Sequence, residues 1–114
     1  MPLTVDLHSH TNLSDGQLSP VALVRLAAEQ GVDVLAVTDH DTTEGVAAAQ
    51  AEAASHGLRI LPGIEISAQH AGRGIHVLGY FGEGALPKLE AWQATRRQAR
   101  RERVEAMVTL LAST

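Results

Sequence analysis

Four short motifs of this sequence set histidines and carboxylates beside apolar runs. DLHSHTNLSDG, at residues 6–16, holds two histidines and an aspartate, and TDHDT, at residues 38–42, holds a histidine between two aspartates. GIEIS, at residues 63–67, places a glutamate between isoleucines, and GIHVLGY, at residues 74–80, places a histidine in an apolar run. These motifs supply six candidate metal ligands: His8, His10, Asp15, His40, Glu65 and His76.

Each of these residues also has a purely structural explanation. A lone histidine in a strand is more often a hydrogen-bonded core residue than a ligand, Asp41 could be a helix N-cap, and Glu65 could pair with an arginine. The structural reading needs a separate explanation for every one of these residues. Each ionised carboxylate in an apolar strand would need its own partner, because a buried charge without a partner is costly. A cluster of divalent metal ions would neutralise all of these carboxylates together. The sequence therefore favours a metal site, with Asp39 and Asp41 as candidates to support the ligand His40.

The ligand types indicate the metal and the reaction. Imidazoles with carboxylates and no thiolate suit zinc, manganese or iron better than calcium or copper(I). Six ligands exceed what one tetrahedral ion needs, so we expect two or three divalent ions, with Glu65 able to bridge. Clustered ions acting on an ester indicate phosphoryl hydrolysis by a metal-activated hydroxide. The absence of cysteine and of a G-x-S-x-G elbow agrees with a reaction that uses no side-chain nucleophile.

The elements that must position these residues alternate along the chain. Residues 2–10 alternate in polarity, which predicts a strand with Leu3, Val5 and Leu7 on its packed face and both histidines on the other. A helix is expected over residues 19–31, from the N-cap Ser19 to Gly31. Residues 32–41 are typical of a buried parallel strand.

The remaining elements continue the alternation. We expect a second helix from Asp41, with Glu44 placed for a capping box, to Gly57. Strands are predicted over residues 59–70 and 74–81 around a turn at residues 71–74, followed by a helix from about Leu86 to the end. The order β-α-β-α-β-β-α predicts an α/β fold with a parallel sheet or barrel. Its carboxyl edge is where ligands and catalytic groups gather in such folds.

The composition limits the class of protein. The 114 residues are enough for one small domain, and aromatic residues are only 3% of the chain, so the core must be aliphatic. No apolar run approaches the roughly 20 residues of a membrane span. The absence of cysteine fits a reducing compartment, and we expect a cytoplasmic location. The net charge of -4 argues against a protein that coats nucleic acid.

The helix near the end of the chain carries most of the basic residues. Five of the nine lie in RRQARRER, at residues 96–103. They could form a solvated face paired with Glu102 and Glu105, or one or two could grip substrate phosphates, since arginine binds phosphate bidentately. We take Arg97 and Arg101 as the candidates for substrate binding.

Taken together and in this order, the four motifs resemble the PHP family (polymerase and histidinol phosphatase). They are most similar to its small bacterial branch, which acts on nucleoside 3',5'-bisphosphates and on the 5' ends of short RNAs. The resemblance implies a distorted (β/α)7 TIM-like barrel with a trinuclear site at the carboxyl ends of its strands. It also implies that His8 and His10 share one ion, that Glu65 bridges to a second ion bound by His76, and that Asp15 and His40 bind the third.

The sequence also departs from the family. Its members supply another histidine from the middle of the chain and an Asp-x-His near the end, whereas no histidine follows His76 here. We therefore expect residues 1–114 to be the N-terminal portion of a single PHP domain, inactive or impaired alone and prone to self-association through its open sheet edge. A shortened natural variant, or one completed by a partner chain, is the alternative.

The expected substrate is a small nucleotide or a short oligonucleotide, with no membrane involved. Two other functions stay open from the sequence. One is a phosphatase of another small phosphomonoester, such as histidinol phosphate. The other is a non-catalytic module that the metals stabilise.

Overall fold

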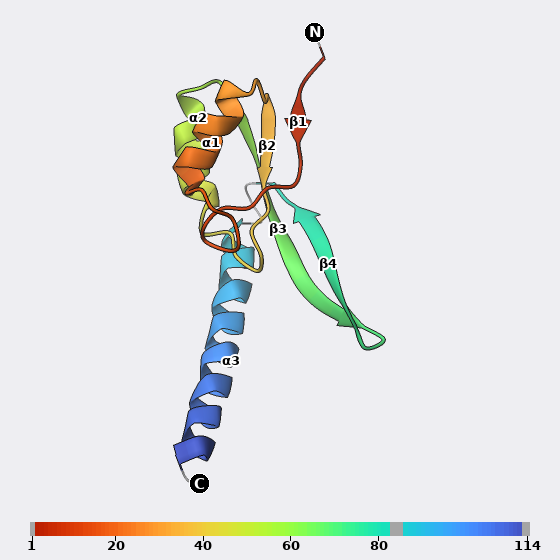
Figure 1. Cartoon of the computed structure of the whole chain (residues 1–114), viewed down its shortest axis with the longest axis vertical. Coiled ribbons are helices and arrows are strands. Elements are labelled where there is room, and N and C mark those ends of the chain that lie inside the picture. The colour runs from red at the N-terminus through yellow and green to blue at the C-terminus, as the bar shows by residue number, and fades with distance from the viewer. Residues whose placement is uncertain (1, 83–85, 113–114) are drawn as a thin grey trace. The chain divides into compact units, whose positions relative to one another are not determined.

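A computed structural model of the chain describes residues 2–82 and 86–112. The elements run in the predicted order (Figure 1): β1 (Val5–Asp6), α1 (Pro20–Glu29), β2 (Val34–Val37), α2 (Val46–Ala54), β3 (Arg59–His70), β4 (Arg73–Tyr80) and α3 (Leu86–Ala112). The chain forms two compact units, Met1–Glu83 and Gly84–Thr114, so that the sheet with its two short helices and the long helix α3 are separate bodies.

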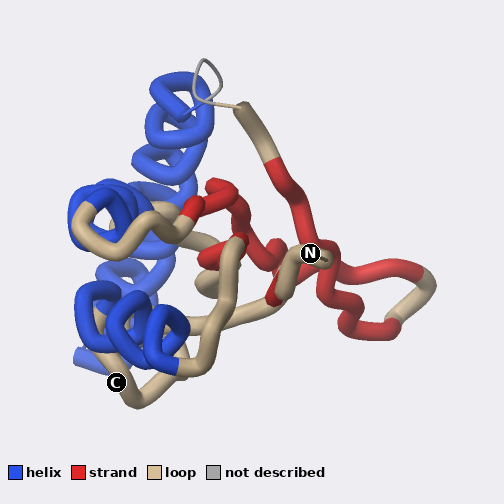
Figure 2. Tube along the Cα trace, turned by 90° about the horizontal axis from the view of Figure 1, so that it is seen from above, coloured by secondary structure: helices blue, strands red, loops and turns tan. Residues whose placement is uncertain are grey.

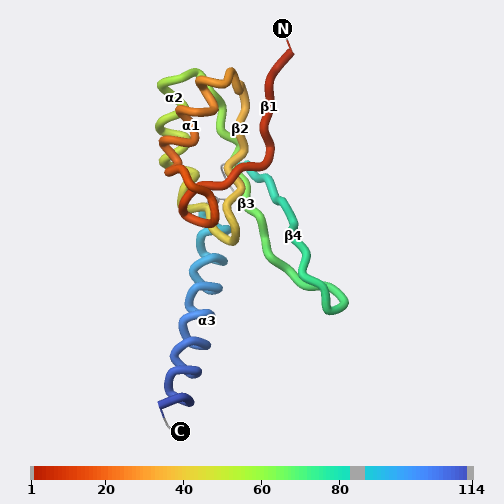
Figure 3. Tube along the Cα trace, viewed as in Figure 1, coloured from red at the N-terminus to blue at the C-terminus, as the bar shows by residue number. Residues whose placement is uncertain are grey.

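The four strands form one mixed sheet in the order β1-β2-β3-β4. β1 and β3 both pair with β2 in parallel, and β4 pairs with β3 in antiparallel fashion. The parallel ladder of β2 and β3 ends at the pair Val37↔Pro62. Beyond that point β3 continues with β4 as a hairpin that extends past β2 (Figure 3). The fold is therefore an α/β half-barrel, consistent with part of the expected TIM-like barrel.

The hydrophobic core lies between the sheet and the two short helices. α1 and α2 lie together on one side of β2 and β3 (Figure 2). As the scarcity of aromatic residues predicts, the buried cluster is aliphatic and rich in alanine: Val24, Ala27, Leu35, Val37, Ala49, Ala53 and Leu58. This packing holds β2 and β3 in place, and thereby positions the residues that follow the parallel ladder of these strands.

Local signals place the ends of α1 and of the hairpin as predicted. Ser19 is the N-cap of α1, and its hydroxyl accepts a hydrogen bond from the Ala22 amide. Gly31 follows the end of α1 with a φ of 78°, in the left-handed region that ends helices. In the β3–β4 hairpin, Ala71 and Gly72 have φ values of 52° and 78°, as a two-residue hairpin turn requires.

The first predicted strand is too long. β1 pairs only at Val5↔Val34 and Asp6↔Leu35, so the histidines of the motif follow the strand rather than lie in it. The predicted packed face is also exposed, and the Leu3 side chain is 70% accessible. The reason is the position of β1 at the sheet edge, where β2 is its one neighbour among the described strands.

The predicted start of the second helix is also wrong. α2 begins at Val46 after Gly45, and no side chain caps it. Asp41 has a φ of 55°, in the left-handed region, whereas a helix N-cap typically has an extended backbone. Its carboxylate accepts a hydrogen bond from the Ser67 amide at 3.1 Å. Tertiary pairing with β3 thus overrides the capping box expected from Asp41 and Glu44.

The second unit contains the helix α3. Four apolar residues near its end are between 53% and 71% exposed: Val104, Met107, Val108 and Leu111. Near its start the Arg96 guanidinium lies 4.9 Å from the centre of the Trp92 ring, a cation–π distance. In the part of the chain that the structure describes, no helix combines the length and the apolar character that crossing a membrane requires.

Candidate metal centre

The candidate ligands come from segments that the sheet brings to one place. His8 and His10 follow β1, and His40 follows β2. An isolated parallel bridge pairs His40 with Glu65 of β3, just beyond the end of the parallel ladder. In β4, His76 lies diagonally opposite Glu65, on the same face of the hairpin, because Leu78 is the direct partner of Glu65.

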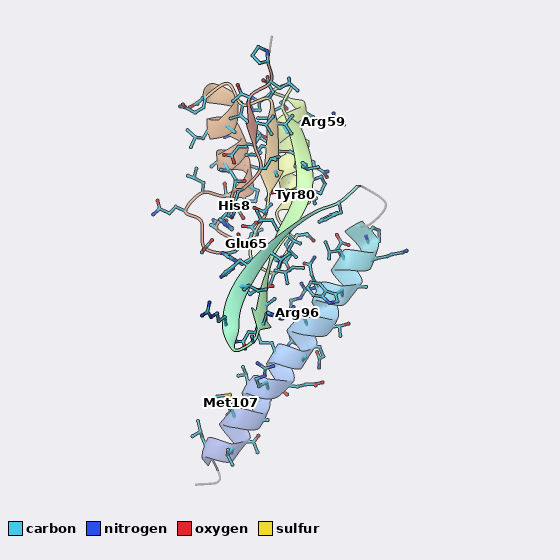
Figure 4. All side chains as sticks on the ribbon, turned by 90° about the vertical axis from the view of Figure 1, so that its right-hand side faces the viewer. His8, Arg59, Glu65, Tyr80, Arg96 and Met107 are labelled. Atoms are coloured by element: carbon cyan, nitrogen blue, oxygen red, sulfur yellow. The ribbon has the colours of Figure 1, made fainter. Side chains whose placement is uncertain are left out.

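Glu65 is 5% exposed and lies next to His8, as Figure 4 shows, with three further histidines close by. Its Oε1 atom lies 2.6 Å from His8 Nε2 and 3.5 Å from His10 Nε2. Its Oε2 atom lies 2.8 Å from His76 Nδ1 and 3.3 Å from His40 Nδ1. The two oxygens of one carboxylate thus face different pairs of imidazoles, which is the arrangement that a bridging ligand needs.

Asp15 connects the other side of the group. Its Oδ2 atom lies 3.0 Å from His40 Nε2, and its Oδ1 atom lies 3.5 Å from His10 Nδ1. The rings of His10 and His40 stack with 4.6 Å between their centres and 7° between their planes. Each of these two imidazoles therefore faces Asp15 with one nitrogen and Glu65 with the other.

The six side chains form three overlapping groups, each with three ligand atoms within 4.8 Å of one another. The groups are His8–His10–Glu65, His10–Asp15–His40 and His40–Glu65–His76. The structure thus brings together every ligand that the sequence predicts. Among these six residues, His10, His40 and Glu65 each belong to two groups, and how many ions the groups would hold stays a prediction.

The donor set fits divalent ions. Two ligand atoms bound to one ion at about 2.1 Å lie roughly 3.0–3.5 Å apart, and most of the separations among these nitrogens and oxygens fall in or near that range. His8 Nε2 and His10 Nε2 also point at each other across 3.1 Å. Within residues 2–82, His10 Nδ1 is buried without a hydrogen-bond partner, a costly arrangement that a metal ion would relieve.

The charge state of Glu65 suits this role. Burial raises the pKa of its carboxyl, but the hydrogen bond to His8 and the positive charges of His40, His10 and His8 lower it further than burial raises it. The net pKa of Glu65 lies below its ordinary value of 4.5. Glu65 is therefore ionised at neutral pH, as a metal ligand must be.

Asp39 holds the loop that carries Asp15. Its carboxylate is buried and accepts three short hydrogen bonds, from the Thr11 amide at 2.6 Å and from the Thr11 and Ser14 hydroxyls at 2.7 Å. Gly16 closes the same loop, since a Cβ atom there would lie 2.4 Å from the carbonyl oxygen of His10. These contacts turn the loop back toward the sheet, so that the Asp15 carboxylate lies close to the stacked rings of His10 and His40.

The backbone beside the ligands is held in a similar way. The Ser9 hydroxyl donates to the Ala36 carbonyl at 2.6 Å, and the Thr38 amide donates to the Ser9 carbonyl at 2.9 Å. The Asp41 amide donates to the Glu65 carbonyl at 2.9 Å. Asp39 and Asp41 thus support the ligand segments through the backbone and loop, and neither carboxylate joins the three ligand groups.

Sequence reasoning did not identify the hydroxyl residues of this support. Thr11, Ser14 and Thr38 all lie inside the quoted motifs, between or beside the ligands. Their position within a metal motif, where nearby backbone must be held rigidly, is the signal that could have identified them. The predicted substrate residues Arg97 and Arg101 lie four positions apart on α3, in the other unit, and their role stays a prediction.

The chain is similar in sequence to a known domain family and to bacterial enzymes. The sequence model of the PHP domain family matches residues 6–112. A 5'-3' exoribonuclease of Haemophilus influenzae is 43% identical over 98 residues, which cover 86% of this chain and 36% of that protein. A 3',5'-nucleoside bisphosphate phosphatase of Chromobacterium violaceum is 39% identical over 103 residues, which cover 90% of this chain and 36% of that protein. The chain thus spans about a third of the length of these relatives.

Solved structures show the same fold. An amidohydrolase from Chromobacterium violaceum, determined with sulfate and without metal, matches 91% of this chain and 37% of its own, with a TM-score of 0.76 and 38% identity. A protein of Bifidobacterium adolescentis, for which a metal-dependent phosphoesterase function has been proposed, matches 98% of this chain and 39% of its own. Its TM-score is 0.75 and its identity is 33%.

Proposed function

Because the chain belongs to the PHP domain family, we propose that it forms part of a metal-dependent phosphoesterase that releases phosphate from a nucleotide. The substrate is a nucleoside 3',5'-bisphosphate or a short oligonucleotide with a 5'-phosphate. The observation that carries this proposal is the convergence of six ligands on three overlapping groups around Glu65. The relatives that act on RNA and on nucleoside bisphosphates support the substrate class.

Two or three divalent ions, of manganese, zinc or iron, would be held by these groups. The chemistry that such ions supply when bound is activation of water and neutralisation of phosphate charge. The protein contributes ionised carboxylates at Glu65 and Asp15, and histidines whose positions the surrounding segments fix. His8, His10, Asp15, His40, Glu65 and His76 are the proposed ligands.

Recognition of the substrate would involve the basic helix. Arg97 and Arg101 are four residues apart, so their guanidinium groups share one side of α3. Both are exposed, and arginine is suited to bidentate contact with phosphate. We assign these two residues to binding of the substrate phosphates. The cytoplasmic location expected from the sequence stays a prediction.

We further propose that residues 1–114 are the N-terminal portion of a single PHP domain. Each ligand group holds three protein atoms, and the relatives are about three times as long as the matched region. Later parts of a longer chain would supply further ligands and complete the barrel. On this proposal the 114 residues alone are inactive or impaired.

A substrate panel tests the proposal. The full gene product and the 114-residue chain, both loaded with manganese, are assayed for phosphate release from adenosine 3',5'-bisphosphate, a 5'-phosphorylated oligonucleotide and histidinol phosphate. We expect the full product to prefer the two nucleotide substrates. Preference for histidinol phosphate would contradict the substrate class, and no turnover with bound metal would indicate a non-catalytic module. Equal activity of both chains would contradict the incomplete domain.

A further inference from the structure

Tyr80, the last residue of the motif GIHVLGY, contacts the segment that carries the first two histidines. Its hydroxyl donates a hydrogen bond to the carbonyl oxygen of Leu7 at 2.5 Å, across 73 positions of the sequence. Leu7 directly precedes His8. Figure 4 labels both residues, Tyr80 at the end of β4 and His8 in the segment that follows β1. The end of β4 is thus tied to the backbone beside a candidate ligand.

The backbone at His8 has few other restraints. The β1–β2 ladder ends at Asp6, and the His8 amide is held by the short-range bond to the Asp6 carboxylate at 3.1 Å. On the far side, Ser9 is fixed to β2 by its hydroxyl bond to Ala36. On the N-terminal side of His8, the hydrogen bond from Tyr80 to the Leu7 carbonyl plays the corresponding role.

A glycine of β3 leaves room for the Tyr80 ring. Gly63 of β3 is the direct partner of Tyr80 in the β3–β4 ladder. A Cβ atom at Gly63 would lie 2.8 Å from Thr38 Cγ2 and 3.3 Å from Tyr80 Cδ1. Because glycine has no side chain, the ring packs close to the β3 backbone and its hydroxyl reaches across to Leu7.

We propose that Tyr80 is a positioning residue of the metal centre. Its hydroxyl holds the Leu7 carbonyl and thereby sets the direction in which His8 presents Nε2 to Glu65, which lies 2.6 Å away. The inference rests on the proposed function in one respect, namely that His8 binds a metal ion. It adds a residue that is neither a ligand nor a neighbour of one in the sequence.

A double-mutant cycle on metal binding tests the role of Tyr80. Manganese binding is measured by titration calorimetry for the unchanged protein, Tyr80→Phe, His8→Ala and the double variant. Phenylalanine keeps the ring and removes only the hydroxyl. We expect Tyr80→Phe to weaken the binding step that His8 serves by about tenfold, as loss of a residue that orients a ligand does. In the His8→Ala protein the same substitution should cause no further loss.

The controls separate this role from general stability. Thr95→Val also removes a hydroxyl that donates to a backbone carbonyl, that of Ala91 within α3, and should leave manganese binding unchanged. Hydrogen exchange of the Ser9 amide should be faster in metal-free Tyr80→Phe, because the segment around His8 is less restrained. An equal loss in both backgrounds, or no loss, overturns the inference alone. If His8→Ala itself leaves binding unchanged, His8 is not a ligand, and this part of the proposed function fails with the inference.

Discussion

Glu65 illustrates how a charged residue becomes stable in an apolar strand. Its neighbours in β3 are Ile64 and Ile66, and it is 5% exposed, so an isolated carboxylate there would be costly. Four imidazoles surround its two oxygens, and three of them, those of His8, His40 and His10, lower its pKa in spite of burial. The histidines and the carboxylate therefore stabilise one another as a group, and the loss of Glu65 would affect two of the three ligand groups.

The substitution Glu65→Gln should remove most metal binding. Glutamine keeps the size of the side chain but loses the charge, and two ligand groups lose a member. We expect manganese to bind more than about 100-fold more weakly, because loss of a ligand costs at least as much as loss of its supporting residues. Calorimetric titration measures this change.

A matched control is available outside the candidate centre. Glu52 also pairs with a histidine, His56, at 3.1 Å, and belongs to none of the ligand groups. Glu52→Gln should leave manganese binding unchanged. Comparable losses in the two variants would show that the effect is one of general charge and not of the centre.

At the scale of elements, the loop between β1 and α1 depends on a residue that follows β2. Asp39 accepts three hydrogen bonds from this loop, and all three donors lie at residues 11–14. The loop is irregular, so its conformation is set by these bonds and by Gly16 and not by a ladder or helix. In that conformation Asp15 lies 3.5 Å from His10 and 3.0 Å from His40.

The substitution Asp39→Asn should loosen the loop. An amide has one acceptor oxygen where the carboxylate has two, and its NH₂ group would face donors, so at least one buried donor loses its partner. The expected decrease in the free energy of unfolding is about 1–3 kcal/mol, measured by urea denaturation. Asp33→Asn is the control, because the carboxylate of Asp33 is exposed and accepts a bond from the Thr4 amide, and we expect a change below about 0.5 kcal/mol. Equal effects would contradict the anchoring role.

The pairing of α1 with α2 should depend on pH. Glu52 of α2 accepts hydrogen bonds from Arg25 of α1, at 2.8 Å, and from His56, and these bonds lower its pKa below 4.5. A carboxyl whose pKa is lower in the folded chain stabilises the fold above its unfolded pKa, and this contribution is lost as the pH falls through the lowered value. The stability difference between the unchanged protein and Glu52→Gln should therefore be present near neutrality and decrease as the pH falls below 4.5 and through the lowered pKa of Glu52.

Urea denaturation across that pH range measures this difference. A difference that stays constant down to pH 3 would contradict it. The pair is exposed, so added salt should also reduce the difference at neutral pH.

At the scale of the molecule, two strands have a single neighbour each among the described strands. They are β1 and β4, the outer strands of the sheet. Apolar side chains on both strands are exposed, among them Val5 at 47% and Val77 at 48%. An edge with unpaired backbone groups and apolar side chains favours pairing with another chain.

We predict that the 114-residue chain self-associates as its concentration rises. Sedimentation velocity should show a shift from monomer to larger species. A lysine on the edge strand, in Val77→Lys, should reduce this association, because charged edge residues oppose strand pairing. A monomer at every concentration, or association unaffected by Val77→Lys, would contradict pairing through β4.

Much of this protein could be predicted from its sequence. The order of the elements, the N-cap Ser19, the stop at Gly31 and the hairpin turn follow from local chemistry and hydrophobic alternation. The candidate ligands are also visible in the sequence, and their binding of metal stays a prediction. The aliphatic core follows from composition. These features depend on residues that are close in the sequence, which is why pattern and residue type suffice for them.

Other features were decided only by tertiary structure. The short β1, the left-handed Asp41, the sharing of His10 and His40 between ligand groups, and the bond from Tyr80 to Leu7 all depend on residues that lie far apart in the sequence. Asp41 is the clearest case, since its local sequence predicts a helix start while its contact with Ser67 draws it to β3. The sequence by itself determined which side chains can bind metal. The packing of the sheet decided which of them meet, because only the folded chain brings their atoms within bonding distance.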